Sequence, residues 1–235
     1  MELIKKSWTK SDGEEFQQFL IGCGRPEKEE WTKRIINTKM SVLAVLSPII
    51  KDITKKIAKG NFMSFLDLWL WDYFENTSVN GGLIMKIKDF DTMKSYFLPY
   101  CERADNWATC DLLTFQIDKN NEKQFWDLSL ELINSNKPFV RRVGINIWFK
   151  YIEREGYLTK IFELVNSMRE EKEYYVNMVV AWLVAESFAR NREATLEFFK
   201  TNTLNDFTAN KSVSKCRDSF RVSKEDKELL LQYRR

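Results

Sequence analysis

Apolar residues recur at spacings of three and four along much of the chain. Spacing of this kind places apolar side chains on one face of an α-helix. It is clearest in residues 61–76, 122–135, 137–155 and 171–191. Only 8 Gly and 4 Pro occur in 235 residues, fewer than sheet proteins with many tight turns usually need. The sequence therefore predicts an all-α fold. Short breaks between the helices are expected at residues 80–82, 104–106, 119–121 and 154–156.

The helices recur with a regular period. The centres of four apolar stretches lie near Trp69, Asp111, Ile145 and Val180, which gives steps of 42, 34 and 35 residues. HEAT-type repeats have a period of about 40 residues and TPR-like repeats one of about 34. We therefore expect a curved solenoid of HEAT-like antiparallel helix pairs, an α–α superhelix. An irregular α bundle is the alternative. A length of 235 residues suits a single domain over residues 1–235.

Composition excludes several kinds of site. The chain contains no histidine, which removes the commonest general base, the commonest metal ligand and any Ser–His or Cys–His nucleophile. Its four cysteines are scattered and form no Cys-x-x-Cys pair. We therefore expect no metal, no cofactor and reduced thiols. The sequence has neither a signal-peptide start nor an apolar run long enough for a membrane span, so a cytoplasmic protein with no membrane partner is expected.

Charge is concentrated near the C-terminus. The net charge is +3, yet residues 211–235 alone carry eight Lys and Arg against four Asp and Glu. A basic helical segment at the end of a nearly neutral chain points to a polyanionic partner. The alternative interpretation is an ordinary solvated terminal helix.

The stretch "DNWATCD" places Trp107 four residues before Asp111. On a helix this spacing brings the two side chains to the same face, one turn apart. Asp105 and Asn106 are both candidates for the helix N-cap. From spacing alone, a functional pair and a core tryptophan beside a helix-start carboxylate both remain open.

Two later helices carry further candidates. In "FVRRVGI", Arg141 and Arg142 fall in the first turns of a helix, where the helix dipole disfavours cations. Each therefore needs a carboxylate or a phosphate nearby, and for one of them a structural ion pair is the expected partner. In "YYVNMVVAWLVAESFAR", one face carries Tyr175, Met178, Trp182 and Glu186, and another carries Val176, Val180, Leu183 and Ser187. One face can pack inward while the other lines a groove, unless the whole helix is core.

These three stretches, in this order, resemble the bacterial HEAT-like-repeat DNA alkylation repair glycosylases (AlkD type). The resemblance covers about residues 40–200. It rests on Trp-x-x-x-Asp in "DNWATCD", on the arginine and small apolar run of "FVRRVGI", and on the tryptophan helix 174–190. It implies a HEAT-like-repeat fold and excision of cationic N3- or N7-alkylated purines from duplex DNA by base excision repair, without a cofactor. A monomer is expected.

The resemblance also implies the role of each site residue. Asp111 corresponds to the catalytic carboxylate, Trp107 and Trp182 to the aromatic pair that flanks the damaged nucleotide, and Arg142 to the arginine that binds the DNA backbone. Further cations expected near the backbone are Arg141, Lys137, Lys150, Arg190, Lys211, Lys215 and Arg217.

The sequence also departs from the family pattern. Ile49 and Ile50 follow Pro48 where the family often has a basic residue, and Asn177 and Met178 replace the usual Gln-Lys. Two alternatives to a glycosylase therefore stay open: a non-catalytic DNA-binding protein of the same fold, and a HEAT-like scaffold for other proteins.

Overall fold

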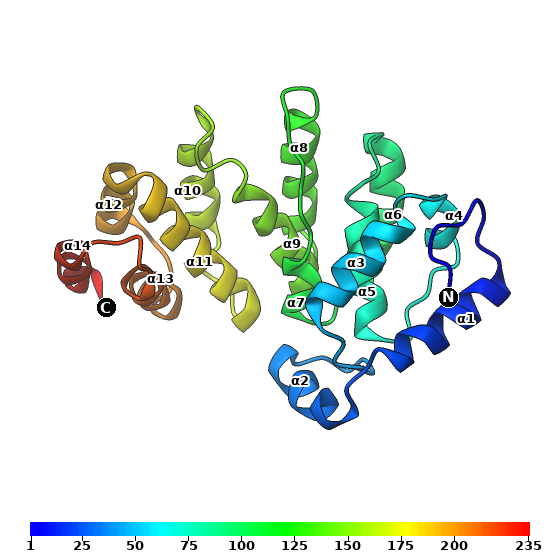
Figure 1. Cartoon of the computed structure of the whole chain (residues 1–235). Coiled ribbons are helices and arrows are strands. Elements are labelled where there is room, and N and C mark those ends of the chain that lie inside the picture. The colour runs from blue at the N-terminus through cyan, green and yellow to red at the C-terminus, as the bar shows by residue number, and fades with distance from the viewer. The chain divides into compact units, whose positions relative to one another are not determined.

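A computed structural model describes all residues, 1–235, and is all-α as the sequence predicts (Figure 1). It contains fourteen α-helices and two short 3₁₀ helices, and its only β-type contact is an isolated bridge between Ser41 and Tyr73. The chain divides into two compact units, Met1–Gln116 (unit 1) and Ile117–Arg235 (unit 2). Each unit is described by itself below. None of the helices is both long and apolar enough to span a membrane.

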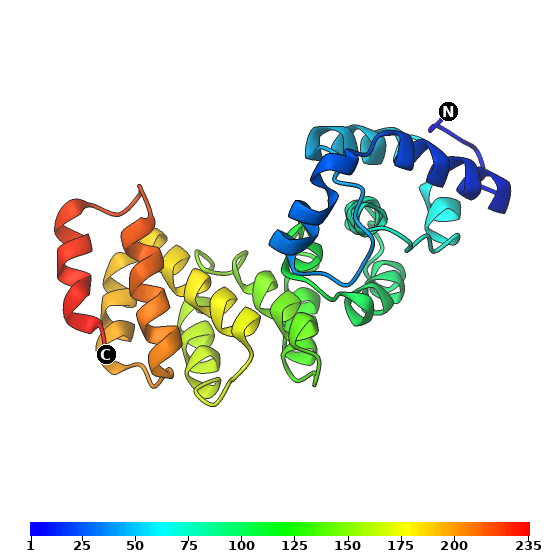
Figure 2. The same ribbon diagram turned by 90° about the horizontal axis from the view of Figure 1, so that it is seen from below.

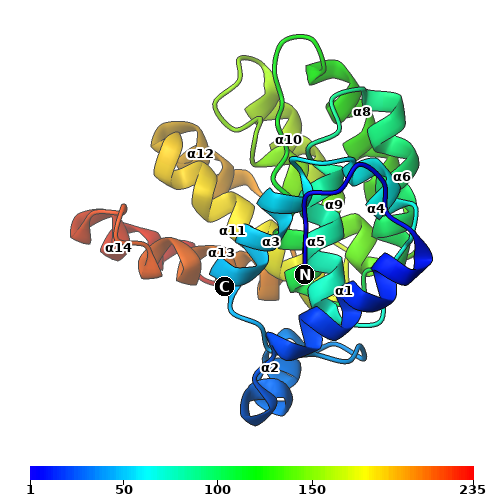
Figure 3. The same cartoon turned by 45° about the vertical axis from the view of Figure 1, so that its right-hand side comes forward.

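Unit 1 is built around one buried helix, α5 (Phe74–Ile84). It packs against α3 (Ser47–Ile57), α4 (Phe62–Leu66) and α6 (Phe90–Arg103) (Figure 3). It also packs against α7 (Trp107–Asp111). The remaining helices of the unit are α1 (Lys10–Gly22), the 3₁₀ helix η1 (Pro26–Lys28) and α2 (Glu29–Ile36). Contacts on several sides explain why even the polar residues Asn76, Thr77 and Asn80 of α5 are buried.

Unit 2 contains a row of helices that pack in order. Helix α9 (Pro138–Trp148) lies between α8 (Glu122–Ile133) and α11 (Tyr174–Arg190), and α11 also packs against α12 (Arg192–Thr201) and α13 (Asp206–Asp218) (Figure 2). The other elements are α10 (Tyr157–Ser167), α14 (Lys224–Leu229) and the 3₁₀ helix η2 (Leu230–Tyr233). The predicted basic segment 211–235 thus comprises the end of α13, α14 and η2.

Local signals set many helix starts. Pro138 occupies the first turn of α9, where its missing N–H costs little. Polar side chains cap α6, α7, α13 and α14 by accepting a backbone N–H of the first turn. These caps are Asp89, Asn106, Asn205 and Ser223.

The prediction of a continuous helix over residues 61–76 is wrong. Helix α4 ends at Leu66, α5 begins at Phe74, and Trp69 between them has a left-handed φ of 51°. Tertiary contacts hold this irregular segment. The amide of Asn80 donates to the carbonyl of Leu70 (2.8 Å), and the guanidinium of Arg103 lies 5.5 Å from the rings of both Trp69 and Trp71. These contacts outweigh the local helical pattern.

Two other predicted boundaries also differ. Residues 80–82 lie inside α5 and do not break it. A Cβ at Gly81 would come within 2.7 Å of Leu112 Cδ1 and of the Tyr100 hydroxyl, so this glycine permits close packing against α6 and α7. The helix predicted over residues 137–155 ends at Trp148, and turns follow as far as Gly156. The breaks at 104–106, 119–121 and 154–156 are confirmed.

Candidate functional site

Helix α7 carries both Trp107 and Asp111 and has only five residues. A helix of this length is not stable by itself, so contacts outside it must hold it. Its N-cap is Asn106, one of the two candidates, which is fully buried. The Asn106 side-chain oxygen accepts the Thr109 N–H (2.9 Å). Its amide nitrogen donates to the Asp105 carboxylate (2.8 Å) and to Thr109 Oγ1 (3.0 Å).

Thr109 connects α7 to two neighbouring helices. Its hydroxyl lies 3.1 Å from that of Thr77 on α5, and its carbonyl accepts a hydrogen bond from the Tyr100 hydroxyl on α6 (2.9 Å). All three residues are buried. Hydrogen bonds shielded from water in this way are stronger than exposed ones and costly to leave unmade. The α7 backbone is therefore fixed to α5 and α6.

Trp107 is half-buried at the start of α7. Its indole N–H donates to the carbonyl of Ile35 on α2 (3.2 Å). Its ring packs against a small apolar cluster that includes Ile36 and Val42. One edge of the indole is thus held by the protein. Nearby, Trp31 and Ile35 lie one turn apart on α2 and are both exposed. Sequence reasoning missed this exposed apolar pair, although their spacing of four residues was a signal.

Asp111 is the last residue of α7 and is half-buried, one turn after Trp107. This spacing places the side chains of Trp107 and Asp111 on the same face of α7, as predicted. The neighbouring carboxylate of Asp105 has a different task, because it accepts hydrogen bonds from the Thr38 hydroxyl (2.6 Å) and the Lys39 N–H (2.8 Å). Asp105 therefore holds the chain that leads into α7.

Glu75 is the most buried carboxylate of unit 1, with 2% of its surface exposed. It accepts the backbone N–H groups of Leu43 (3.0 Å) and Val45 (3.2 Å). Burial raises the pKa of Glu75, and these backbone hydrogen bonds partly oppose the rise. The contacts tie the extended segment around Ala44, which has a left-handed φ of 55°, to the start of α5.

A cleft of about 610 Å³ lies between α3, α5 and α7. Ala108 and Leu112, on either side of Asp111 along the chain, contribute to its wall, and the exposed residues Lys51, Lys55 and Lys86 also line it. Sequence reasoning missed these lysines. The spacing of Lys51 and Lys55, one helical turn apart on α3, could have identified them. Three cations around one cleft attract an anion such as a phosphate.

In unit 2, α11 has the two predicted faces. Val176, Val180, Leu183 and Ser187 are buried, whereas the face with Tyr175, Met178 and Glu186 is half-exposed. On that second face, Trp182 is 41% exposed and packs on one side against Phe149, with ring centroids 4.5 Å apart. An indole with one covered and one open side can stack on a flat ligand.

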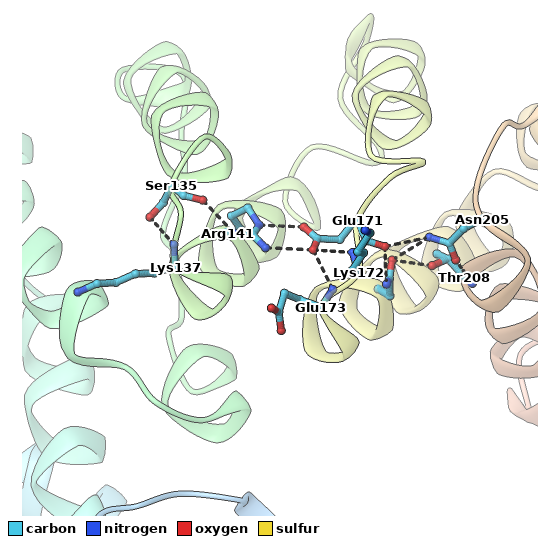
Figure 4. A network of polar contacts seen from close by, with 9 residues as sticks. Ser135, Lys137, Arg141, Glu171, Lys172, Glu173, Asn205 and Thr208 are labelled. Carbon is cyan, nitrogen blue, oxygen red and sulfur yellow. Dashed lines mark hydrogen bonds and ion pairs between the residues drawn. The ribbon is translucent and has the colours of Figure 1, made fainter.

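Arg141 forms the expected structural ion pair. Its guanidinium donates two hydrogen bonds to the Glu171 carboxylate (2.9 and 3.0 Å) and a third to the Ser135 carbonyl (2.9 Å) (Figure 4). Both charged side chains are largely buried. A forked pair of this kind satisfies a cation that the helix dipole would otherwise disfavour.

Arg142 is only 6% exposed and donates to the carbonyl of Tyr175 (2.6 Å). A phosphate would therefore reach only the edge of its guanidinium. The cation predicted at Arg190 is bound by Glu186 (2.7 Å) and Glu153. Thus three of the arginines expected near DNA make contacts within unit 2.

The remaining predicted cations are spread over unit 2. Lys137 and Lys150 are exposed. Lys211 Nζ lies 5.8 Å from the centre of the Phe207 ring, and Arg217 lies 3.9 Å from Glu228. Lys215 lines a cleft beside Trp182.

The four principal candidates are divided between the two units. Trp107 and Asp111 lie in unit 1, and Arg142 and Trp182 lie in unit 2. No group of three or more carboxylate or thiol side chains is arranged to hold a metal ion.

Comparison with protein-family models gives a match over most of the chain. The model described as DNA alkylation repair enzyme matches residues 16–215 and so includes all four of these residues. Comparison with curated proteins gives no match.

Proposed function

The chain belongs to the DNA alkylation repair enzyme family, and from this premise we propose that it is a DNA glycosylase. It hydrolyses the N-glycosidic bond of cationic N3- and N7-alkylated purines in duplex DNA. The observation that carries the proposal is Asp111, a half-buried carboxylate one turn from Trp107 on a helix that buried hydrogen bonds hold in place. A fixed carboxylate of this kind suits the stabilisation of developing positive charge.

The chemistry requires no histidine. An alkylated purine already carries a positive charge, so it leaves without protonation. The bond from its N9 to the sugar C1′ breaks, the electron pair goes to the base and neutralises it, and the sugar gains oxocarbenium character. Asp111 stabilises that charge and orients the water that adds to C1′, as a carboxylate does in glycoside hydrolysis. The water proton passes to the carboxylate and then to solvent, which leaves a neutral base and an abasic site.

Trp107 in unit 1 and Trp182 in unit 2 are each proposed to supply an aromatic surface to the DNA. The electron-rich face of an indole attracts a cation, so both rings favour an alkylated base over an ordinary one. In unit 2, Arg142 contacts the DNA backbone at the exposed edge of its guanidinium. In unit 1, Lys51, Lys55 and Lys86 are proposed as further phosphate contacts, because they surround the cleft beside α7.

We also propose that the helices form HEAT-like pairs within a single domain. In unit 2, α8 packs along α9 as such a pair would. The packing of α9 on α11, and of α11 on both α12 and α13, continues the row of helices that a repeat array requires. We propose that the protein acts on DNA as a monomer in the cytosol.

A base-release assay tests the function. Methylated duplex DNA is incubated with the protein, and released 3-methyladenine and 7-methylguanine are measured by chromatography. We expect release above the spontaneous rate, and its loss in Asp111→Asn. Asp52→Asn is the matched control, because Asp52 is an exposed carboxylate of unit 1 that pairs with Lys56 at 2.7 Å. No release above the spontaneous rate, or equal release by Asp111→Asn, would reject the proposal.

A non-catalytic DNA-binding protein is the second candidate. The departures from the family pattern at Ile49 and Ile50 and at Asn177 and Met178 favour it, because basic residues that the family often has are missing there. It predicts duplex binding that weakens steeply with salt, without base release. A chain that neither binds duplex DNA at low salt nor releases bases would instead be a protein scaffold.

A further inference from the structure

Phe220 is almost fully exposed, at 94% of its surface, more than any other large hydrophobic residue of the protein. It lies between α13 and α14, just beyond the matched residues 16–215. Exposing a phenylalanine side chain forgoes about 2–3 kcal/mol that its burial would contribute. A single exposed ring is common on protein surfaces, so its meaning depends on what lies beside it.

The loop that carries Phe220 is held on both sides of the ring. Val222 is buried, and the Ser219 hydroxyl accepts the Arg221 N–H (3.2 Å). The Arg221 guanidinium binds both oxygens of Glu186 on α11, one of them at 3.0 Å. Ser223 caps α14 by accepting the Asp226 N–H (3.0 Å). These contacts fix the loop, so the loop holds the Phe220 ring in its exposed position.

Phe220 borders a cleft of about 600 Å³ on unit 2. Trp182 and Ala185 of α11 form part of its apolar lining, while Lys215 and Asp218 contribute polar groups. Because Phe149 covers one side of Trp182, only the other side of that indole is open to a ligand. Two aromatic rings that line one open cleft suit a flat aromatic guest.

The charge around the cleft favours a polyanion. Residues 215–224 carry four cations against the carboxylate of Asp218. The cations are Lys215, Arg217, Arg221 and Lys224. Glu186 also lines the cleft and is paired with Arg221, so an excess of positive charge remains. A ligand that combines flat aromatic groups with a negatively charged backbone is a nucleic acid, and aromatic platforms beside cations are the usual means of binding unstacked bases.

We propose that Phe220 and Trp182 hold an unstacked base of bound DNA in this cleft, with Lys215 beside its phosphate. The inference rests on the proposed function in taking DNA as the ligand and in giving Trp182 a contact with a base, but it needs no chemistry at Asp111. It assigns to the loop between α13 and α14 the recognition of a base that has left the stack. Bases stacked within an intact duplex cannot enter the cleft.

Binding to bulged DNA tests the proposal. Two labelled duplexes are compared by fluorescence anisotropy: one carries a single unpaired adenine, and the other has an abasic nucleotide at the same position. The wild-type chain should prefer the adenine bulge. Phe220→Ala should weaken binding to that duplex by roughly fivefold to a hundredfold, the effect of losing one stacked base, and leave binding to the abasic duplex unchanged. Phe220→Tyr should retain the preference.

Tyr174→Ala is the matched control, because Tyr174 is another exposed aromatic residue of unit 2 and lies outside the cleft. It should leave the preference intact. Equal affinity of the wild type for both duplexes, or an equal loss on both in Phe220→Ala, would overturn the proposal. So would a Phe220→Ala variant that changes only self-association. Base release is a separate readout. A preference for the adenine bulge without base release supports the cleft and rejects the glycosylase. Base release without that preference supports the glycosylase and rejects the cleft.

Discussion

The two helices that carry Trp107 and Trp182 differ in length and in what fixes them. Helix α7 in unit 1 has five residues and depends on buried hydrogen bonds through Asn106 and Thr109, most of them between uncharged groups. Helix α11 in unit 2 has seventeen residues, a row of buried apolar side chains, and ion pairs at Glu186. A buried network defines one geometry and fails when one member is lost, whereas a long packed helix tolerates single changes at its surface. The carboxylate proposed for catalysis lies on the less tolerant helix.

The largest stability effect is expected at the α7 cap. Asn106→Ala removes the cap and leaves buried partners unsatisfied, so the free energy of unfolding should fall by about 2–4 kcal/mol. The matched change in unit 2 is Asn191→Ala, which removes an exposed cap of α12 and should cost about 1 kcal/mol or less. Urea denaturation measures both. Equal losses of stability in Asn106→Ala and Asn191→Ala would contradict the claim that the α7 cap matters more than an exposed cap in unit 2.

The next effect concerns two glycines, one in each unit. A Cβ at Gly81 would lie 2.7 Å from Leu112 Cδ1, and one at Gly144 would lie 2.8 Å from Ile133 Cγ2. Each alanine substitution should reduce stability by about 1–3 kcal/mol through overpacking. Gly81→Ala should also slow base release by the folded protein, because Leu112 follows Asp111. An equal slowing by Gly144→Ala would show that the site is not especially sensitive to α7.

A third comparison separates structural cations from proposed DNA contacts. Arg141→Gln breaks a largely buried pair with Glu171, and we expect a loss of about 1–2 kcal/mol of stability with no change in the salt dependence of DNA binding. Lys51→Gln should leave stability within about 0.5 kcal/mol and reduce the slope of log affinity against log salt by about one. Salt titrations of both variants measure the slopes, and the opposite pattern would reverse the two roles.

The smallest effect is a dependence of stability on pH. Hydrogen bonds from Arg221 and then Arg190 lower the pKa of Glu186 below its ordinary value of 4.5. Its contribution is therefore fully present above pH 4.5 and is lost as the pH falls through the lowered pKa. At pH 7, Glu186→Gln should cost less than about 1 kcal/mol, because its arginine partners are exposed.

The difference in stability between Glu186→Gln and wild type should disappear as the pH falls, because the Glu186 carboxylate becomes protonated. The cost of Thr109→Val in unit 1 should persist, because the side chains bound to Thr109 are the uncharged Thr77 and Asn106. Thermal unfolding between pH 7 and pH 3 measures both. A Thr109→Val cost that also disappears with acid would contradict the contrast.

Sequence reasoning succeeded where local pattern decides the structure. The apolar period predicted α8 and α11 with small errors at their ends, and it distinguished two faces of α11, of which the structure buries the one with Val176 and Val180. The dipole argument predicted that Arg141 needs a partner. It could not identify Glu171, thirty positions away in the sequence.

Sequence reasoning failed where distant contacts decide the structure. The break around Trp69 interrupts a good helical pattern because contacts with Asn80 and Arg103 are stronger. The network around α7 joins Thr109 to Thr77, thirty-two positions earlier, and such hydrogen bonds leave no periodic signal. Asp111 and Trp107 could thus be selected from spacing and family resemblance, while the contacts that hold α7 required the structure.

The central claim is that Asp111 drives base release. The most direct measurement is the single-turnover rate of 7-methylguanine release from duplex DNA at saturating protein, for wild type, Asp111→Asn and Asp52→Asn. We predict that Asp111→Asn binds the duplex normally and loses about 10²–10³-fold in rate, as expected for a preorganised electrostatic group, while Asp52→Asn keeps the wild-type rate. Equal rates for wild type and Asp111→Asn, with equal DNA binding, would contradict the claim.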